Sequence, residues 1–167
     1  MLLEMRVSIL TIDPFTHTPI VILKDLEGKN AVPIWIGIME ASAIATELEK
    51  IRLSRPMTHD LFKNVLDSTS VRLEKIVLTD LKDNTYYASL YLNREQKEVV
   101  IDSRPSDAIA LALRSGSPIY VDEKVIAKSQ KIDLQQRVQG ESEEEMKKRW
   151  EEFLESMNPE DFGKYKM

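Results

Sequence analysis

Two charged segments, each just before an expected helix, carry the side chains best suited to chemistry. Asp102-Ser103-Arg104-Pro105-Ser106-Asp107 follows a β-branched run, and Arg55-Pro56-Met57-Thr58-His59-Asp60 leads into a second helical pattern. Proline suits the first turn of a helix, and Ser or Thr accepts hydrogen bonds from the free N–H groups there. We therefore expect Thr58 to cap its helix, and Ser103 or Ser106 to cap the other.

The residue types in these segments support three kinds of chemistry. An arginine fork and a helix N-terminus attract the same anion, so both segments suit phosphate binding. Carboxylates bind divalent cations, and a histidine such as His59 can serve as a general base or acid. The same residues could instead only cap their helices and pair with each other, which is the commoner role of such residues. Both interpretations stay open at this point.

The composition is that of one globular domain and excludes several kinds of site. The 167 residues are 43% hydrophobic and 31% charged, and none is cysteine. Disulfides, zinc-thiolate sites and thiol nucleophiles are therefore excluded. Neither a P-loop nor GxGxxG occurs, so no nucleotide cofactor is expected. There is no leader pattern and no apolar run of membrane-spanning length, which predicts a cytoplasmic protein without a membrane partner.

The net charge of −5 lies mostly near the end of the chain. The segment from Glu141 to Met167 has nine acidic and five basic residues, so the first 140 residues are nearly balanced. A balanced body argues against a basic surface that coats nucleic acid without specificity. It leaves room for a local basic patch or for an acidic pocket that holds a metal.

The end of the chain differs from the rest in pattern as well as in charge. We expect a domain over residues 1–140 and a C-terminal helical tail over 141–167. The tail carries one apolar stripe at helical spacing, formed by Met146, Trp150, Phe153, Leu154 and Met157. This stripe predicts an amphipathic helix that packs on the domain or on a partner subunit.

Hydrophobic periodicity predicts an α+β fold with helices packed on a largely antiparallel or mixed sheet. The expected strands cover 5–13, 19–24, 31–36, 71–81, 86–92, 99–101 and 118–121. The expected helices cover 39–51, 58–68 and 122–129, with another that starts near Pro105 and stops at Gly116. Short turns between consecutive strands favour antiparallel pairing, and Pro33 favours an edge strand or a bulge.

An internal repeat emerges when the chain is shifted by 67 residues against itself. Without a gap, Asp13 then aligns with Asp80, and Glu40 aligns with Asp107. This register predicts a duplicated βββα unit. The two copies differ at the corner between strand and helix, which is apolar at Trp35-Ile36-Gly37 in the first copy and charged in the second.

Four motifs follow one another along the chain: Pro33-Ile34-Trp35-Ile36-Gly37, Arg55-Pro56-Met57-Thr58-His59-Asp60-Leu61, Leu81-Lys82-Asp83-Asn84-Thr85-Tyr86-Tyr87-Ala88, and Asp102-Ser103-Arg104-Pro105-Ser106-Asp107-Ala108. Together they resemble the bifunctional nuclease domain family, from about Met5 to Asp122. The resemblance implies an α+β domain with nuclease activity on both DNA and RNA. It supplies no established catalytic set.

On this resemblance we expect a phosphodiesterase whose charged segments converge in space. The expected catalytic residues are His59, Asp60, Asp102 and Asp107. Asp60, Asp102 and Asp107 would hold a divalent cation, Mg²⁺ or Mn²⁺, that activates water. The expected phosphate-binding residues are Arg55, Arg104, Ser103 and Lys82.

The rival interpretation is a non-enzymatic ligand- or protein-binding oligomeric module whose charged corners are structural salt-bridge networks. A nuclease needs carboxylates of different motifs close together in an open cleft. A structural network needs each carboxylate buried against Arg55 or Arg104, with no cavity. In either case, edge strands and the apolar corner at Trp35 favour a homodimer.

Overall fold

The computed structural model describes residues 1–14 and 16–129, which form seven strands and four helices. The strands are β1 (Leu2–Ile12), β2 (Pro19–Asp25), β3 (Ala31–Trp35), β4 (Arg72–Lys82), β5 (Thr85–Arg94), β6 (Lys97–Ser103) and β7 (Ile119–Asp122). The helices are α1 (Ile38–Leu48), α2 (Thr58–Ser68), α3 (Pro105–Ser115) and α4 (Glu123–Ser129). The expected α+β class is confirmed.

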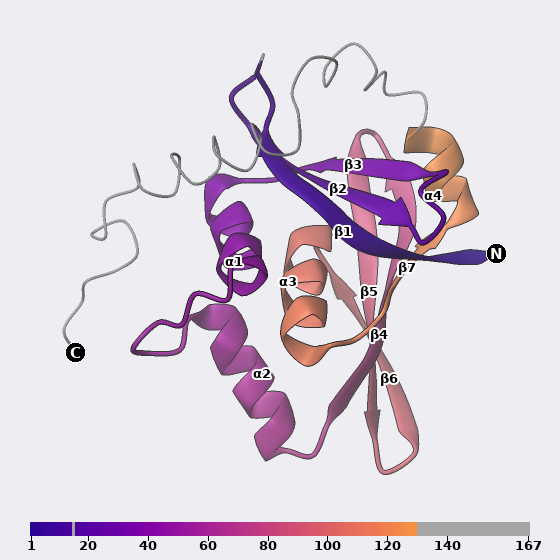
Figure 1. The fold of residues 1–167 in the computed structure, drawn as a ribbon. Helices are drawn as coiled ribbons and strands as arrows, with labels where there is room; N and C mark the ends of the chain where they lie inside the picture. Colours follow the sequence, from indigo (N-terminus) through magenta and orange to yellow (C-terminus); the bar gives the residue numbers. More distant parts are fainter. Residues whose placement is uncertain (15, 130–167) are drawn as a thin grey trace.

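The seven strands form one sheet in the order β3-β2-β1-β7-β4-β5-β6. Strands β1 to β3 make one antiparallel meander and strands β4 to β6 make another (Figure 1). The short strand β7 joins them, antiparallel to β1 and parallel to β4. The sheet is therefore mostly antiparallel, as the short turns in the sequence predict.

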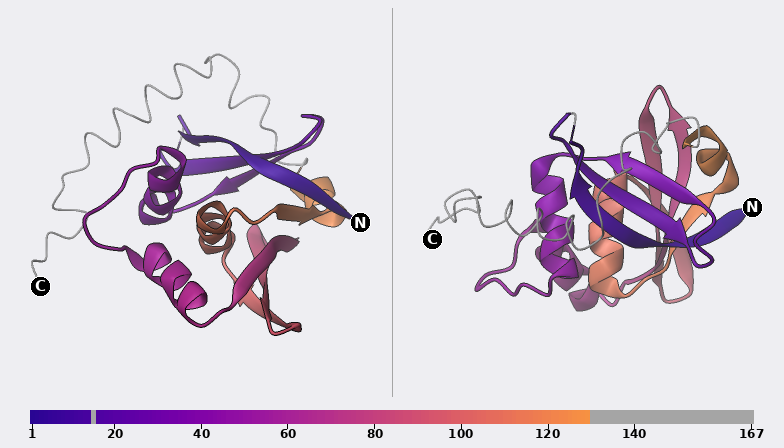
Figure 2. Two further views of the ribbon diagram at one scale, coloured as in Figure 1. Left: turned by 60° about the horizontal axis from the view of Figure 1, so that its bottom comes forward. Right: turned by 45° about the horizontal axis from the view of Figure 1, so that its top comes forward.

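The sheet curves so that its two meanders approach each other. Tyr86 on β5 donates a hydrogen bond of 2.6 Å from Oη to the carbonyl oxygen of Pro33 on β3, although β2, β1, β7 and β4 lie between these strands in the sheet. Helix α4 packs on β3, β4 and β7. Figures 1 and 2 show α3 in the middle of the molecule, with α1 and α2 beside it.

Helix α3 is buried because its sequence is small and apolar. Pro105 occupies its first turn, where a missing N–H costs nothing, and the run from Ala108 to Ala112 is fully buried. Alanine has the highest helix propensity and lets neighbouring elements approach closely. Gly116 then ends the helix at φ 64°, a left-handed conformation that glycine adopts without a Cβ clash.

Several local expectations are confirmed and three are wrong. Pro33 does lie on an edge strand, and α2 spans the expected residues. Helix α1 ends at Leu48 rather than at 51, because Lys50 takes a left-handed backbone conformation with φ 54°. Thr58 is not the N-cap of α2: Met57 holds that position, and the Asp60 carboxylate accepts the Met57 N–H instead. Neither Ser103 nor Ser106 caps α3, because Arg104 is its N-cap residue and no side chain accepts a capping hydrogen bond there.

Other expectations concern features that the structure leaves as predictions. Each meander is followed by a helix, α1 or α3, but a duplication of one unit stays a prediction. The boundary at residue 140 and the amphipathic stripe of the tail lie outside the described residues.

The Trp35 indole donates a 3.0 Å hydrogen bond to Asp13 of the same chain. No helix in the described part of the chain is long and apolar enough to cross a membrane.

The bond between Tyr86 and Pro33 makes a testable contribution to stability. We expect Tyr86→Phe to lower the free energy of unfolding by about 1 kcal/mol, because it leaves the Pro33 carbonyl without this donor. Urea denaturation measures the effect. Tyr87→Phe is the matched control, because Tyr87 follows Tyr86 directly and is 42% exposed. If Tyr86→Phe and Tyr87→Phe had equal free energies of unfolding, this would contradict a stabilising role for the hydrogen bond between Tyr86 and Pro33.

The same tyrosine gives a stability difference that depends on alkaline pH. Burial raises the pKa of Tyr86 to about 12, above its ordinary value of 10.0. The folded state thus favours the neutral phenol, whose contribution is complete below about pH 10 and is lost as the pH rises towards 12. The stability difference between the wild type and Tyr86→Phe should therefore shrink over this interval, measured by urea denaturation at successive pH values.

Candidate functional site

A pocket of about 230 Å³ lies where α1, α2 and the N-terminal end of α3 meet. Its polar lining comes from both charged segments of the sequence and includes Thr58, His59, Arg104 and Asp107. Apolar side chains, among them Met39, Leu53 and Met57, complete the wall. The expected convergence of two of the four family motifs is therefore seen at this pocket.

One polar contact in the pocket joins the two segments directly. His59 Nε2 lies 2.9 Å from Asp107 Oδ1, although the residues are 48 positions apart in sequence. With the proton on Nε2, that nitrogen donates to the carboxylate and Nδ1 carries the free lone pair. A carboxylate that orients a histidine in this way is the arrangement of a general base.

Arg104 binds the same carboxylate from the other side. Its Nε donates to Asp107 Oδ2 at 2.7 Å, and its Nη1 donates to Glu40 Oε1 on α1, also at 2.7 Å. The hydrogen bond to Asp107 and then that to Glu40 raise the pKa of Arg104. Burial works to raise the pKa of Asp107, but Arg104 and His59 outweigh it and the pKa is lowered. Asp107 is therefore a charged acceptor at neutral pH.

Asp60 lies in a different environment from Asp107. Its Oδ1 accepts a 2.6 Å hydrogen bond from Arg114 Nε, and its Oδ2 accepts the Met57 N–H at 3.0 Å. Arg114 is 6% exposed and also donates to the carbonyl oxygens of Ala43 and Ala110. Asp60 thus serves the packing of the three helices, and it does not line the pocket.

The remaining expected site residues lie elsewhere on the surface. Asp102 is exposed on β6, and Ser103 Oγ donates to the carbonyl oxygen of Arg104 at 2.9 Å. Lys82 pairs with Asp80 at 3.2 Å, and Arg55 is exposed between α1 and α2. None of these four lines the pocket.

The three carboxylates expected to hold a metal do not share a site. Asp60 and Asp107 are each engaged by a different arginine, and Asp102 is on the strand that precedes α3. Among residues 1–14 and 16–129, no three His, Asp or Glu side chains are grouped as metal ligands. This arrangement does not fit a cation bound by the expected set, and the use of Mg²⁺ or Mn²⁺ stays a prediction.

Two residues of this region were missed by sequence analysis. Glu40 became visible only as the position that aligns with Asp107 in the 67-residue shift. Arg114 follows an apolar helical run and resembles a basic residue placed to favour the C-terminal end of a helix. An arginine that directly follows the apolar run from Ala108 to Leu113 in a helix is the signal that could have indicated a buried ion pair.

Comparisons with known proteins agree with the four motifs. The family described as "Bifunctional nuclease domain" matches residues 21–133. An uncharacterized protein of Mycobacterium tuberculosis is 35% identical over 167 residues, covering 95% of this chain and 97% of its own length. This relative therefore matches the chain almost from end to end.

Plant relatives match a shorter part. "Bifunctional nuclease 1" of Oryza sativa subsp. japonica is 27% identical over 63% of this chain, and "Bifunctional nuclease 2" of Arabidopsis thaliana is 27% identical over 61%. The matched parts are 33% and 32% of these plant proteins. The chain thus spans about a third of their length.

Removing the buried guanidinium should destabilise the helices. Arg114→Met leaves the Asp60 carboxylate and two carbonyl oxygens without this donor, and we expect a loss of about 3–5 kcal/mol in the free energy of unfolding. Arg104→Met is the matched control, with an expected loss of about 1 kcal/mol or less, because Arg104 is 64% exposed. Urea denaturation measures the free energy of unfolding of both variants. Similar losses in the two would contradict the larger structural role of Arg114.

Asp60 should make stability sensitive to acid. Burial tends to raise the pKa of Asp60, but Arg114 and the Met57 N–H outweigh it and the pKa lies below 3.8. The carboxylate contributes fully above this value and loses its contribution as the pH falls through the lowered pKa. The stability difference between the wild type and Asp60→Asn should therefore be constant near neutrality and shrink below about pH 4, as measured by urea denaturation.

Proposed function

The chain belongs to the bifunctional nuclease domain family, and on this premise we propose that it hydrolyses phosphodiester bonds of DNA and RNA at the pocket of His59, Arg104 and Asp107. The observation that carries the proposal is the 2.9 Å contact between His59 Nε2 and Asp107 Oδ1. It joins two family motifs at the wall of a pocket that also holds a guanidinium. Such a combination suits proton transfer beside a bound phosphate.

In the proposed reaction, His59 acts as a general base through Nδ1. Water attacks phosphorus, its proton passes to Nδ1, and the ester P–O bond breaks as the leaving oxygen takes a proton from solvent. Asp107 holds the imidazole in the required tautomer and stabilises the imidazolium that forms. Each nitrogen of Arg104 already donates one hydrogen bond to Asp107 or Glu40, so the second N–H groups of Nη1 and Nη2 would stabilise the charge that develops on phosphate.

Exposure supports a functional rather than a structural role for Arg104. An ion pair with an exposed guanidinium contributes about 1 kcal/mol or less, so stability alone gives little reason for this network. The ion pair between the buried Arg114 and the partly exposed Asp60 provides structural support nearby. A solvated arginine that keeps open donors can still receive a phosphate.

One observation favours the alternative of a non-enzymatic binding module. Both oxygens of Asp107 and all three nitrogens of Arg104 are already bonded within the chain, as a static salt-bridge network would require. A ligand would then bind the pocket without reacting. A homodimer stays a prediction under either function.

Nuclease assays on single-stranded DNA and RNA test the proposal. We expect His59→Gln and Asp107→Asn to lower the rate by about 100-fold or more, because each removes the oriented base. Glu98→Gln is the matched control, since Glu98 is exposed on β6 and lies outside the pocket. Circular dichroism would verify that each variant is folded. Undiminished activity in folded His59→Gln would refute this site.

The same assay examines the metal expected from sequence. Arms with Mg²⁺, Mn²⁺ and EDTA are run on the wild type and on Asp102→Asn. Activity that needs the cation and is abolished by Asp102→Asn would favour the metal mechanism over the histidine base. Absence of any cleavage by rigorously pure wild type would favour the binding module.

A further inference from the structure

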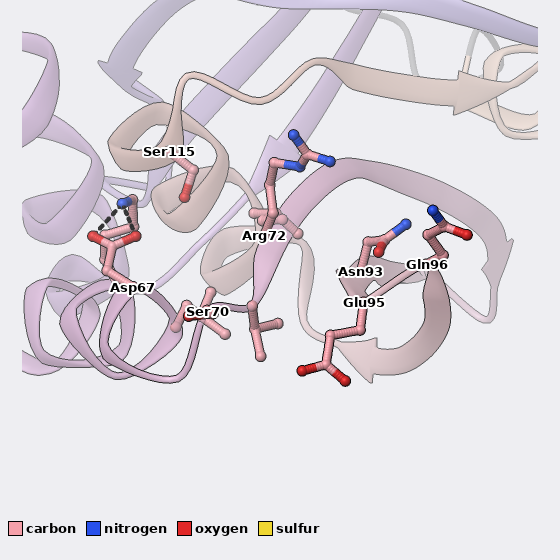
Figure 3. Close-up of a pocket in the computed structure, with 11 residues that line it drawn as sticks. Asp67, Ser70, Arg72, Asn93, Glu95, Gln96 and Ser115 are labelled. Carbon is pink, nitrogen blue, oxygen red and sulfur yellow. Dashed lines mark hydrogen bonds and ion pairs between the residues drawn. The ribbon is translucent and has the colours of Figure 1, made fainter.

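A second and larger pocket lies at the opposite end of α2 from His59. Its volume is about 610 Å³, and it is bounded by the last turn of α2, the start of β4, the turn between β5 and β6, and the last turn of α3. Figure 3 shows labelled polar side chains from all four of these parts, including Arg72, Asn93, Gln96 and Ser115. Neither the family motifs nor the proposed reaction uses this pocket.

The wall of this pocket contains an unsatisfied hydroxyl. Ser115 Oγ is buried and has no hydrogen-bond partner anywhere in residues 1–14 and 16–129. Ser117, two positions along, donates from Oγ to the carbonyl oxygen of Leu73 at 2.6 Å. A buried hydroxyl without a partner is costly, so alanine would suit position 115 better unless something outside the chain bonds to it. Ser115 is one of the residues that line the pocket.

Other polar groups around the pocket are also uncommitted. In the described part of the chain, the side-chain amides of Asn93 and Gln96 and the carboxylate of Glu95 make no hydrogen bond or ion pair. Arg72 lies opposite Asn93 in the ladder of β4 and β5, so both side chains lie on one face of the sheet. Arg72 is 79% exposed and has only a 3.8 Å contact with Glu74.

Charge and polarity limit what this pocket could bind. Lys63 and Arg72 are balanced by Asp67 and Glu95, so no strong net charge selects an anion or a cation. Aliphatic side chains, Leu66, Val71 and Leu73, supply the apolar part of the lining. A fitting ligand is therefore neutral, with an apolar face and with donors and acceptors along its edge.

The backbone around the pocket is held in unusual conformations. Ser70, Glu95 and Gln96 have φ values of 56°, 52° and 66°, in the left-handed region that non-glycine residues seldom adopt. Glu95 and Gln96 form the turn between β5 and β6, where Asn-Gly or Asp-Gly would be favoured. The long polar side chains of Glu95 and Gln96 at this turn are consistent with a role in ligand binding.

We propose that this pocket binds a nucleobase. A base has flat apolar faces and an edge of donors and acceptors, and the amides of Asn and Gln form paired hydrogen bonds with such an edge, best with adenine. The planar guanidinium of Arg72 can stack on the face of the base. Ser115 then gains the partner that the chain does not provide.

The base could belong to a free nucleoside or to a nucleic-acid strand, and the second source rests on the proposed function. Helix α2 has His59 near its first turn and Leu66 and Asp67 near its last, about 11 Å apart along the helix axis. A strand that places one base in this pocket would therefore extend along α2 towards His59. The pocket would hold the substrate at a distance from the bond that is cleaved.

Isothermal titration calorimetry with adenosine and with a short single-stranded oligodeoxyadenylate tests the proposal. We expect Ser115→Ala and Asn93→Ala each to weaken binding about two- to tenfold, because each removes a hydrogen bond to the base. Ser115→Ala should leave thermal stability equal or higher, since it removes an unsatisfied group. Ser117→Ala is the matched control and should behave inversely, with lower stability and unchanged binding.

The outcomes separate this proposal from the proposed reaction. Binding of adenosine as tight as that of the oligonucleotide indicates a free nucleoside as the source, and tighter binding of the oligonucleotide indicates a strand. His59→Gln should retain the binding of adenosine, because His59 does not line this pocket, so a failure of hydrolysis leaves the pocket assignment intact. The assignment is overturned if neither probe binds, or if Ser115→Ala and Asn93→Ala bind both probes as the wild type does.

Discussion

The buried guanidinium of Arg114 is the constraint on which the helical face of the molecule depends. Its donors bind Asp60 on α2 and the carbonyl oxygens of Ala43 on α1 and Ala110 on α3. A buried cation is tolerated only when its donors are satisfied, so the three helices must keep their mutual positions together. Because His59 precedes Asp60 directly, the same ion pair also fixes where the imidazole meets Asp107.

Arg114 in α3 and Arg104 at the N-cap of α3 thus have contrasting environments. The Arg114 side chain is only 6% exposed, whereas Arg104 is mostly solvated and binds Glu40 and Asp107 from outside. Exposed ion pairs contribute little to folding, and enclosed ones specify geometry when complete. The ion pair of Arg114 therefore supports the helices that position the accessible ion pairs of Arg104. A binding or catalytic site needs such support behind its accessible residues.

The sequence predicted the elements well and the pairing of side chains poorly. Alternation and helical spacing located most strands and helices, because these patterns report local burial. The sequence treated Asp60, Asp102 and Asp107 as equivalent carboxylates, but the structure places one in a buried pair, one on an exposed strand and one against His59. Those differences arise from partners about 50 positions away, which no local pattern encodes. The error at Thr58 is local instead: Met57 is the N-cap residue of α2, and the Asp60 carboxylate three positions later accepts its N–H.

The comparison of the two strand–helix corners explains why one arginine binds two carboxylates. The 67-residue shift aligns Glu40 with Asp107 and Gly37 with Arg104, and both carboxylates bind Arg104. The Glu40 carboxylate occupies the space where a Cβ on Gly37 would lie. A side chain at Gly37 would displace Glu40 from its position beside Arg104. The difference between the corners, glycine in one and arginine in the other, is therefore what lets Glu40 and Asp107 bind the same guanidinium.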